Sequence, residues 1–443
     1  MKKFFGLAAV IFTLNACTVK KATLTPYQNI ADLIENSAIG KNHHVGFAIK
    51  EVGASKNMYE KNANLYFIPA SNTKLFTFYT ALNMLGDSVP SFQYIFRKDS
   101  LILWPMADAS FLHPDFKAQK SFDFIKDAGK DVYLVTGRYH GEKYGKGWSW
   151  DDFNEYYQTE INDMPIYGNA VDISCGLFGK LKYTPDLAAL YLNEVSISNQ
   201  LKTVKRGLNN NNWIVPTSIN TNYRQSLPLS LNKTIVENLL SDTLLATGAI
   251  VKPIETLNWR KVPQSANIIY GVASDTLYKH LLLPSDNFIA EELLLNCAAA
   301  NKMDMNTDSV IYWASANLLN DMPNKIKWVD GSGLSRLNLF TPDDMVLVLQ
   351  KIRDKINNDD RLFSLLPAGG ESGTLKDMFK GSTAPYIFAK SGSLTNNYNL
   401  SGYLIGKSGK KYIFSFMNNG FVISTKEIKD EVVRVLSAIH DNY

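Results

Sequence analysis

Apolar residues recur with helical or strand periodicity at both ends of the chain. Near the start, the pattern predicts a helix over Tyr27–Ser37, strands over His44–Glu51 and Tyr59–Tyr66, and an apolar helix that follows Lys74 and ends at Gly86. Near the end, it predicts three strands and an amphipathic helix, over Tyr386–Lys390, Tyr398–Ile405, Lys411–Asn418 and Thr425–Ile439. Both groups of strands would form one antiparallel sheet, with the terminal helices on one face and the helix after Lys74 on the other. The expected fold class is therefore α+β.

The segment between these ends has a different composition. It is rich in aromatic residues around positions 148–157 and carries a polar stretch at 207–212. Because a chain of 443 residues is too long for one ordinary domain, we interpret 92–260 as a large inserted second domain. The first domain would then be split into 18–91 and 261–443, and 1–17 would be a leader.

The leader has the pattern of a lipoprotein signal peptide. Lys2 and Lys3 precede the mostly apolar run Phe4–Leu14, which is too short to span a bilayer. The run continues into Leu14-Asn15-Ala16-Cys17, which resembles a bacterial lipobox cleaved before Cys17. We therefore expect a periplasmic protein anchored to a membrane by lipid on Cys17. The alternative is an ordinary secretory signal with a chance cysteine.

Charge and ligand patterns argue against several classes of function. Lys and Arg total 46 against 42 Asp and Glu, and no basic run is interleaved with aromatic residues, so nucleic-acid binding is not expected. The sequence contains neither H-E-x-x-H nor C-x-x-C, so we expect no metal and no cofactor. We interpret His43-His44 as a polar turn or strand start. Pairing of Cys175 with Cys297 stays open, although a buried free thiol suits Cys297 in its apolar segment.

The candidate nucleophile is Ser71, which lies three residues before Lys74. Residues three apart share a helix face, so the Lys74 amine is placed to take the proton of Ser71 without a histidine. A chain of this length holds about two S-x-x-K matches by chance. Two other matches occur, at Ser230/Lys233 and Ser408/Lys411. Ser71 is favoured because Pro69 suits a helix entry, where free N–H groups favour developing negative charge.

Two further polar groups follow along the chain. Ser285 and Asn287 precede the apolar segment 288–295, so both side chains would project from a loop at a helix entrance. The run Lys390-Ser391-Gly392-Ser393 continues a strand-like segment, and a small residue on an edge strand lets a substrate backbone approach closely. A similar run at 407–409 falls in a turn between two strands, so we interpret Lys407 as a solvated turn residue.

In this order, the blocks resemble those of the D-alanyl-D-alanine carboxypeptidases of the penicillin-binding protein 4 type (peptidase family S13). The blocks are Phe67–Leu75, Ser285–Glu291, Asp330–Arg336 with Thr341-Pro342, Gly373–Leu375 and Lys390–Leu394. The resemblance implies a transpeptidase/β-lactamase-like domain, an antiparallel sheet flanked by helices, interrupted by the large inserted domain. We interpret Asp330–Arg336 as a tight turn and leave it out of the catalytic set.

The resemblance also implies a substrate and a mechanism. Ser71 would attack the carbonyl between the two terminal D-alanines of a peptidoglycan stem peptide. Lys74 would be the base, kept neutral by desolvation and by the nearby charge of Lys390. The backbone N–H groups of Ser71 and Ser393 would form the oxyanion hole. β-Lactam antibiotics would acylate Ser71 in the same way and act as covalent inhibitors.

The remaining residues of the blocks take supporting roles under the same resemblance. Ser285 would relay a proton to the departing D-alanine, and Asn287 would orient the substrate amide or Lys74. Within the substrate-binding run of Lys390, Ser391, Gly392 and Ser393, the first two would bind the terminal carboxylate of the substrate.

Two alternatives to a D-Ala-D-Ala carboxypeptidase or endopeptidase stay open. The first is a β-lactamase or esterase on the same scaffold. Class A β-lactamases carry a glutamate that activates the deacylating water, and no such residue can be assigned here, so fast β-lactam hydrolysis is not expected. The second alternative is a non-catalytic lipoprotein that binds peptidoglycan through its inserted domain. The intact triplet of motifs argues against that alternative.

Overall fold

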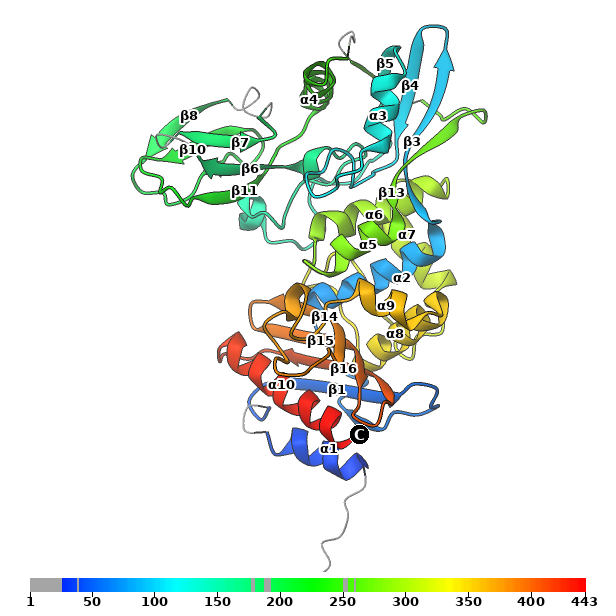
Figure 1. The fold of residues 1–443 in the computed structure, drawn as a ribbon, viewed down its shortest axis with the longest axis vertical. Coiled ribbons are helices and arrows are strands. Elements are labelled where there is room, and N and C mark those ends of the chain that lie inside the picture. Colours follow the sequence, from blue (N-terminus) through cyan, green and yellow to red (C-terminus); the bar gives the residue numbers. More distant parts are fainter. Residues whose placement is uncertain (1–25, 38–39, 177–179, 187–192, 250–253, 259) are drawn as a thin grey trace, which may run out of the picture.

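The computed structural model describes residues 26–443, except for 38–39, 177–179, 187–192, 250–253 and 259. Cys17 and the rest of the expected signal segment lie outside the described residues. The described chain is elongated and has three tiers (Figure 1). These are a sheet flanked by α1 (Pro26–Glu35) and α10 (Thr425–Asn442), a middle layer of helices, and an upper part built from smaller sheets and helices. None of the helices described is long and apolar enough to cross a membrane.

The lower tier is built on a sheet whose strands come from both ends of the chain. Its order is β14-β15-β16-β1-β2. The strands are β1 (His44–Glu51), β2 (Tyr59–Lys61), β14 (Ile387–Leu394), β15 (Asn397–Ile405) and β16 (Lys411–Asn419). β1 pairs antiparallel with β16 along its whole length, starting with His44 opposite Asn419. The expected antiparallel sheet is therefore confirmed. The strand predicted to reach Tyr66 is wrong beyond Lys61, because Asn62 adopts a left-handed conformation (φ 50°) that breaks the extended backbone.

Helices cover both faces of this sheet, as expected. On one face, α1 (Pro26–Glu35) and α10 (Thr425–Asn442) enclose a core that includes the fully buried side chains of Phe414 and Leu436. α10 begins with a reciprocal cap. The Ser424 hydroxyl accepts the Glu427 N–H, and the Glu427 carboxylate accepts the Ser424 N–H. On the other face lie α2 (Lys74–Met84) and α8 (Pro342–Ile356), which pack against a separate core.

In the middle tier, α2 is largely buried between the sheet and the other helices. The other helices of this tier are α5 (Ser274–Leu282), α6 (Asn287–Ala300), α7 (Thr307–Asn317) and α9 (Asp359–Leu365). The ring of Phe76 on α2 stacks on Phe340 with 4.2 Å between the ring centroids. Every residue of α6 from Phe288 to Ala299 is buried, which is typical of a helix enclosed by protein. This packing fixes the first residues of α2 and α6 relative to each other.

The upper part leaves the first domain after α2 and returns to it before α5. Its larger sheet has the order β12-β5-β4-β3-β13, with β3 (Ser88–Arg97), β4 (Ser100–Pro105), β5 (Asp131–Val135), β12 (Glu255–Leu257) and β13 (Asn267–Ala273). Helices α3 (Lys120–Asp127) and α4 (Lys233–Ala246) pack on it. Because β3 pairs with β13, we propose that the inserted unit extends over 88–273, slightly wider than the 92–260 expected from composition.

Two smaller sheets complete the inserted unit, at the upper left of Figure 1. One has the order β11-β6-β7, with β6 (Ala170–Cys175), β7 (Leu181–Thr184) and β11 (Arg224–Pro228). The other has the order β8-β10-β9, with β8 (Asn193–Ser198), β9 (Lys205–Arg206) and β10 (Asn212–Pro216). The segment between β5 and β6 carries no described strand, and it passes back over the first domain at positions 148–162.

Candidate active site

Ser71 lies in a short 3₁₀ turn, Ala70–Thr73, that leads into α2. The α-helix proper begins at Lys74, and Ala70 has a left-handed backbone (φ 50°) that is unfavourable for a residue with a Cβ. Neighbouring contacts hold this turn in place. Thr73 Oγ1 donates to the Ala70 carbonyl at 2.9 Å, and Gly333 lies so close that a Cβ there would overlap the same carbonyl. Backbone strain of this kind persists only where the surroundings impose it, and it is common at functional sites.

Lys74 is fully buried and makes three hydrogen bonds through Nζ. The partners are Ser71 Oγ at 3.2 Å, Asn287 Oδ1 at 2.6 Å and the Ser332 carbonyl oxygen at 2.7 Å. The expected pair of Ser71 and Lys74 is thus in direct contact, and Asn287 completes the group. Two of the three partners are carbonyl oxygens, which accept and never donate.

Burial and charge act in opposite directions on Lys74. Desolvation lowers the pKa of its amine to about 8, while the carboxylates of Asp286, Asp330 and Glu291 act to raise it. The expected desolvation is present, but the charges that act on the Lys74 pKa are these carboxylates and not Lys390. The amine is therefore partly neutral near neutral pH, as a base requires.

Lys390 is the second fully buried lysine of the site. Its Nζ donates to Ser285 Oγ at 2.8 Å and to the Ser391 carbonyl at 2.7 Å. Burial lowers the pKa of Lys390 well below its usual range, and the charge of Lys74 lowers it further. The repulsion expected between these two lysines therefore lowers the pKa of Lys390 and not that of Lys74.

Ser285 and Asn287 lie at the entrance of α6, as predicted. Asp286 caps this helix by accepting the Ile289 N–H at 2.8 Å. Ser285 is held in a left-handed conformation (φ 68°), which turns its hydroxyl toward Lys390. The Asn287 amide bridges two parts of the molecule, because its Oδ1 accepts from Lys74 while its Nδ2 donates to the Tyr157 carbonyl of the inserted unit at 3.0 Å.

The run Lys390–Ser393 lies on β14, the edge strand of the sheet. Ser391 Oγ donates to Thr374 Oγ1 at 2.7 Å, and Ser393 is exposed. Gly392 has a packing role that was not expected from the sequence. A Cβ at this position would overlap the Pro69 carbonyl and crowd Asn72. Its lack of a side chain thus lets β14 pack directly on the turn that carries Ser71, in addition to any role toward substrate.

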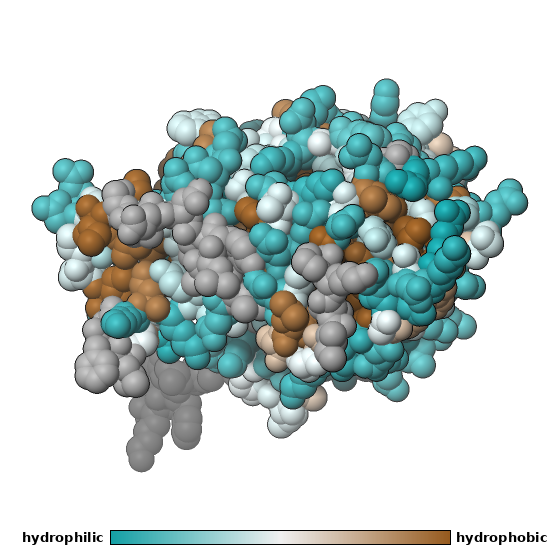
Figure 2. Space-filling model, turned by 90° about the horizontal axis from the view of Figure 1, so that it is seen from above, coloured by the Kyte–Doolittle hydropathy of each residue, from teal (hydrophilic) through white to brown (hydrophobic). Residues whose placement is uncertain are grey.

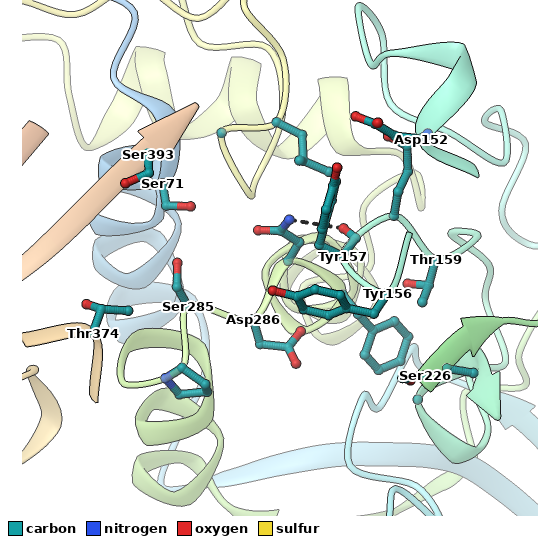
Figure 3. Close-up of a pocket in the computed structure, with 18 of the residues that line it drawn as sticks. Ser71, Asp152, Tyr156, Tyr157, Thr159, Ser226, Ser285, Asp286, Thr374 and Ser393 are labelled. Atoms are coloured by element: carbon teal, nitrogen blue, oxygen red, sulfur yellow. Dashed lines mark hydrogen bonds between the residues drawn. The ribbon is translucent and has the colours of Figure 1, made fainter. Parts of the chain in front are cut away.

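A cavity of about 880 Å³ lies between these groups and the inserted unit. Figure 3 shows Ser71 and Ser393 on one wall, with Asp152, Tyr156 and Tyr157 across from them. Polar and acidic side chains dominate the lining. Its aspartates are Asp115, Asp151, Asp152, Asp172 and Asp286, and Arg336 also reaches it. The cavity therefore suits an extended polar ligand that carries positive charge.

Two residues near the proposed catalytic group were not predicted from the sequence: Ser332, which contacts Lys74, and Glu291, which holds the turn that carries Ser332. The interpretation of Asp330–Arg336 as a turn outside the site is incomplete, because the Ser332 carbonyl in that turn accepts from Lys74. Glu291 accepts the N–H groups of Gly331 at 3.0 Å and Ser332 at 2.7 Å. Burial and the charge of Asp330 raise the pKa of Glu291 to about 7. The sequence did contain a signal for Glu291, because this residue follows Asn287 by four positions and therefore shares its helix face.

The other candidates take structural positions. Within the part of the chain that the structure describes, no cluster of three or more His, Cys, Asp or Glu residues could hold a metal ion. Cys175 and Cys297 do not pair with each other, and Cys297 is buried in α6, where burial raises the pKa of its thiol. Lys233 is an exposed residue at the start of α4, and Lys411 forms an ion pair with Asp359.

The sequence matches one protein family over nearly its whole length. The model of the D-Ala-D-Ala carboxypeptidase 3 (S13) family matches residues 27–439. The D-alanyl-D-alanine carboxypeptidase DacB of Haemophilus influenzae is 23% identical, over 92% of this chain and 91% of that protein. The D-alanyl-D-alanine carboxypeptidase of Actinomadura sp. (strain R39) is 25% identical, over 85% of this chain and 77% of that protein.

Solved structures confirm the expected fold class. The crystal structure of penicillin binding protein 4 (dacB) from Haemophilus influenzae has a TM-score of 0.71 and 21% identity, over 93% of this chain and 98% of that one. The same protein complexed with a novel β-lactam has a TM-score of 0.66 and 20% identity, with the same coverage. The α+β arrangement with a transpeptidase-like domain is thus shared with this group of proteins.

Proposed function

The chain belongs to the D-Ala-D-Ala carboxypeptidase 3 (S13) family, and from this premise we propose that Ser71 is the nucleophile of its reaction. The protein is a serine-type D-Ala-D-Ala carboxypeptidase/endopeptidase and a penicillin-binding protein that acts on peptidoglycan. The observation that carries the proposal for Ser71 is its contact with a buried, partly neutral lysine, 3.2 Å from Oγ to Lys74 Nζ. A hydroxyl next to an unprotonated amine is an activated nucleophile.

The hydrogen bonds of Lys74 explain how it acts as a base. A neutral amine has two N–H groups and one lone pair. Asn287 Oδ1 and the Ser332 carbonyl can only accept, so they take both N–H groups of the neutral form. The lone pair is then left to face Ser71 Oγ, from which it removes the proton as Oγ attacks the carbonyl between the two terminal D-alanines.

The remaining steps use the groups around the cavity. The N–H groups of Ser71 and Ser393 would stabilise the oxyanion that forms on the attacked carbonyl. Lys74 then returns the proton to the departing D-alanine nitrogen, with Ser285 as the relay, and the carbonyl–nitrogen bond breaks. An ester between Ser71 and the stem peptide results, and water hydrolyses it to free the serine.

The terminal carboxylate of the substrate has its site at β14. The hydroxyls of Ser391 and Thr374 lie 2.7 Å apart and line the cavity, so both can donate to a carboxylate. The buried Lys390 lies next to them, with Nζ 2.7 Å from the Ser391 carbonyl. Arrival of the anion favours the protonated form of Lys390, because an opposite charge offsets the burial that lowers its pKa.

The acidic lining indicates which stem peptides fit. A peptide with a free ammonium group on its acyl side would find Asp152 across the cavity from Ser71, and Asp151 also lines the cavity. Charge-assisted hydrogen bonds to carboxylates are about twice as strong as neutral ones. We therefore infer that the preferred substrates carry such an ammonium.

The protein acts outside the cytoplasm, where peptidoglycan lies. We propose further that it is periplasmic and held at a membrane by lipid on Cys17, on the strength of the lipobox-like sequence before that residue. Replacement of Cys17 by Ala should move the protein from the detergent phase to the aqueous phase in a partition experiment.

The nucleophile is tested with benzylpenicillin and intact-mass spectrometry on the protein from residue 18. We expect a one-to-one adduct that persists for many minutes and maps to Ser71 after digestion, and no adduct with Ser71→Ala. The matched control is Ser230→Ala, at the S-x-x-K match just before α4, and this variant should be acylated like the wild type. A covalent adduct on Ser71→Ala would disprove the assignment. Consumption of penicillin without an adduct would indicate a β-lactamase, and untouched penicillin would favour a non-catalytic binding protein.

A further inference from the structure

The two carbonyl oxygens that take the N–H groups of Lys74 are themselves held by other contacts. Asn287 Oδ1 lies 2.6 Å and the Ser332 carbonyl 2.7 Å from Lys74 Nζ. If either oxygen moved, the lone pair of the neutral amine would no longer be confined to the direction of Ser71. The groups that fix these two oxygens therefore bear on the rate of acylation.

Asn287 is fixed from the inserted unit. Its Nδ2 donates to the Tyr157 carbonyl at 3.0 Å, a contact drawn as a dashed line in Figure 3. An amide that flipped by 180° would place its NH₂ against the Nζ donors of Lys74 and its oxygen against another carbonyl. The Tyr157 backbone thus selects the orientation in which oxygen faces the lysine.

The Ser332 carbonyl is fixed by two buried carboxylates. Glu291 accepts the N–H groups of Gly331 and Ser332, and Asp330 accepts those of Gly333 at 2.9 Å and Ser335 at 2.7 Å. Each of these bonds joins a carboxyl group to a buried backbone donor, and a hydrogen bond to the ionised form belongs to the stronger class. Together they determine where the turn places its carbonyl.

Trp148, which lies in the inserted unit, makes a further contact with this turn. Its indole Nε1 donates to Asp330 Oδ2 at 2.9 Å, across 182 residues of sequence. The chain around it also packs closely on the turn. Gly147 has φ 79°, and a Cβ there would lie 2.9 Å from Ser335 Oγ and 2.8 Å from the Leu337 side chain. The indole is thus placed to hold the Asp330 carboxylate in the position that binds Gly333 and Ser335.

We propose that Trp148 is a positioning residue for Lys74, acting through Asp330 and the Ser332 carbonyl, so that the inserted unit is part of the catalytic apparatus. The proposal rests on the role of Lys74 as the base for Ser71. The crossing segment 148–157 then reaches both acceptors of the lysine, one through Trp148 and the other through the Tyr157 carbonyl. Replacement of Trp148 should disturb the base without removing any group that lines the cavity.

The variant Trp148→Phe keeps the aromatic ring and removes only the N–H donor with part of the ring system. Loss of one hydrogen bond to a charged group should lower the acylation rate constant at the pH optimum by about tenfold. The negative charge of Asp330 would also be less compensated. The carboxylates of Asp286, Asp330 and Glu291 raise the Lys74 pKa, while the nearby Lys390 has a strongly lowered pKa of its own. A less compensated Asp330 should therefore raise the Lys74 pKa and move the acid limb of the pH–rate profile up by about half a pH unit.

The experiment measures benzylpenicillin acylation of the wild type, Trp148→Phe and Trp150→Phe from pH 5.5 to 9. Trp150 is the matched control, because it lies two residues away and is 77% exposed. The rate constant is taken per molecule that becomes acylated, so unfolded protein lowers the amplitude and not the rate. If Trp148 had only a structural role, Trp148→Phe would lower the melting temperature and the acylation amplitude. It would leave the acid limb of the pH–rate profile in place.

The expected result is a slower rate and a shifted acid limb for Trp148→Phe, with Trp150→Phe matching the wild type. The proposal is overturned if Trp148→Phe matches Trp150→Phe in both rate constant and acid limb. It is also overturned if only amplitude and melting temperature change. A wild type that forms no adduct on Ser71 would instead disprove the proposed nucleophile, and with it this inference.

Discussion

Acylation of Ser71 should require the neutral form of Lys74, and the structure gives the pH at which that form appears. The pKa of Lys74 is lowered to about 8 by burial, against the opposing charges of Asp286, Asp330 and Glu291. Because the lowered group is the base, activity is present above this pKa and lost as pH falls through it. Lys74 is about half neutral at pH 8 and about 1% neutral at pH 6, so the acylation rate should fall about fiftyfold between them.

The perturbation that tests this reasoning is Lys74→Arg. A guanidinium keeps the positive charge and remains protonated at every accessible pH, so it cannot accept the proton of Ser71. Removal of a general base costs about 100-fold to 10,000-fold in rate. The matched control is Lys233→Arg, which changes the lysine of a chance S-x-x-K match on the surface of α4. It should leave both the rate and the pH profile unchanged.

The assay is the second-order rate constant for acylation by benzylpenicillin, followed by mass spectrometry at each pH. Circular dichroism over the same range shows that the protein stays folded. A profile that is flat from pH 6 to pH 8 would refute a neutral Lys74 as the base. A Lys74→Arg variant within tenfold of the wild type would refute it too, since some other group would then be accepting the proton.

Three further predictions follow from single contacts. Asn287→Asp places a carboxylate against Lys74 Nζ and should raise the Lys74 pKa by about one to three units, which moves the acid limb of acylation to higher pH. Gly392→Ala forces a Cβ onto the Pro69 carbonyl and should destabilise the protein by roughly 1–3 kcal/mol in thermal unfolding, whereas Gly86→Ala meets nothing within 4 Å and should be neutral. Asp152→Asn should lower kcat/KM about tenfold for peptides with a free ammonium group and leave acylation by benzylpenicillin unchanged.

The fold could be predicted at the two ends of the chain and much less in between. β1 has the bounds that were expected, because it is a short run of successive buried residues. α10 begins at the expected Thr425, because its apolar residues form one buried face with a helical period. The larger sheet of the inserted unit depends on pairing β3 with β13, whose partners lie far apart in sequence. No local pattern encodes such a contact. The short strands β7, β9 and β12 also contain too few residues for alternation to be recognised.

The part of the candidate site whose chemistry depends on side chains could be predicted from the sequence. The motifs located Ser71, Lys74 and Lys390, which lie around one cavity, although the roles of these residues remain proposals. Ser332 could not be found in this way, because it contributes a backbone carbonyl, which every residue type carries. Trp148 could not be found either, since its partner lies in a distant turn. Sequence motifs therefore gave the proposed reacting groups and omitted most of what positions them.

If Lys74 is the base, as proposed, its chemistry explains why so much of the molecule surrounds it. A histidine titrates near neutral pH even when it is exposed, whereas a lysine must be desolvated before its amine is neutral. A desolvated amine has to find hydrogen-bond acceptors within the protein, and unpaired carbonyls or carboxylates left by a poor fit would be costly. Burial of Lys74 thus requires Asn287 and Ser332 to be placed accurately, and those acceptors require supports of their own. The supports come from α6, from the turn after Asp330 and from the inserted unit, so the base is a property of the assembled fold and not of the four-residue motif.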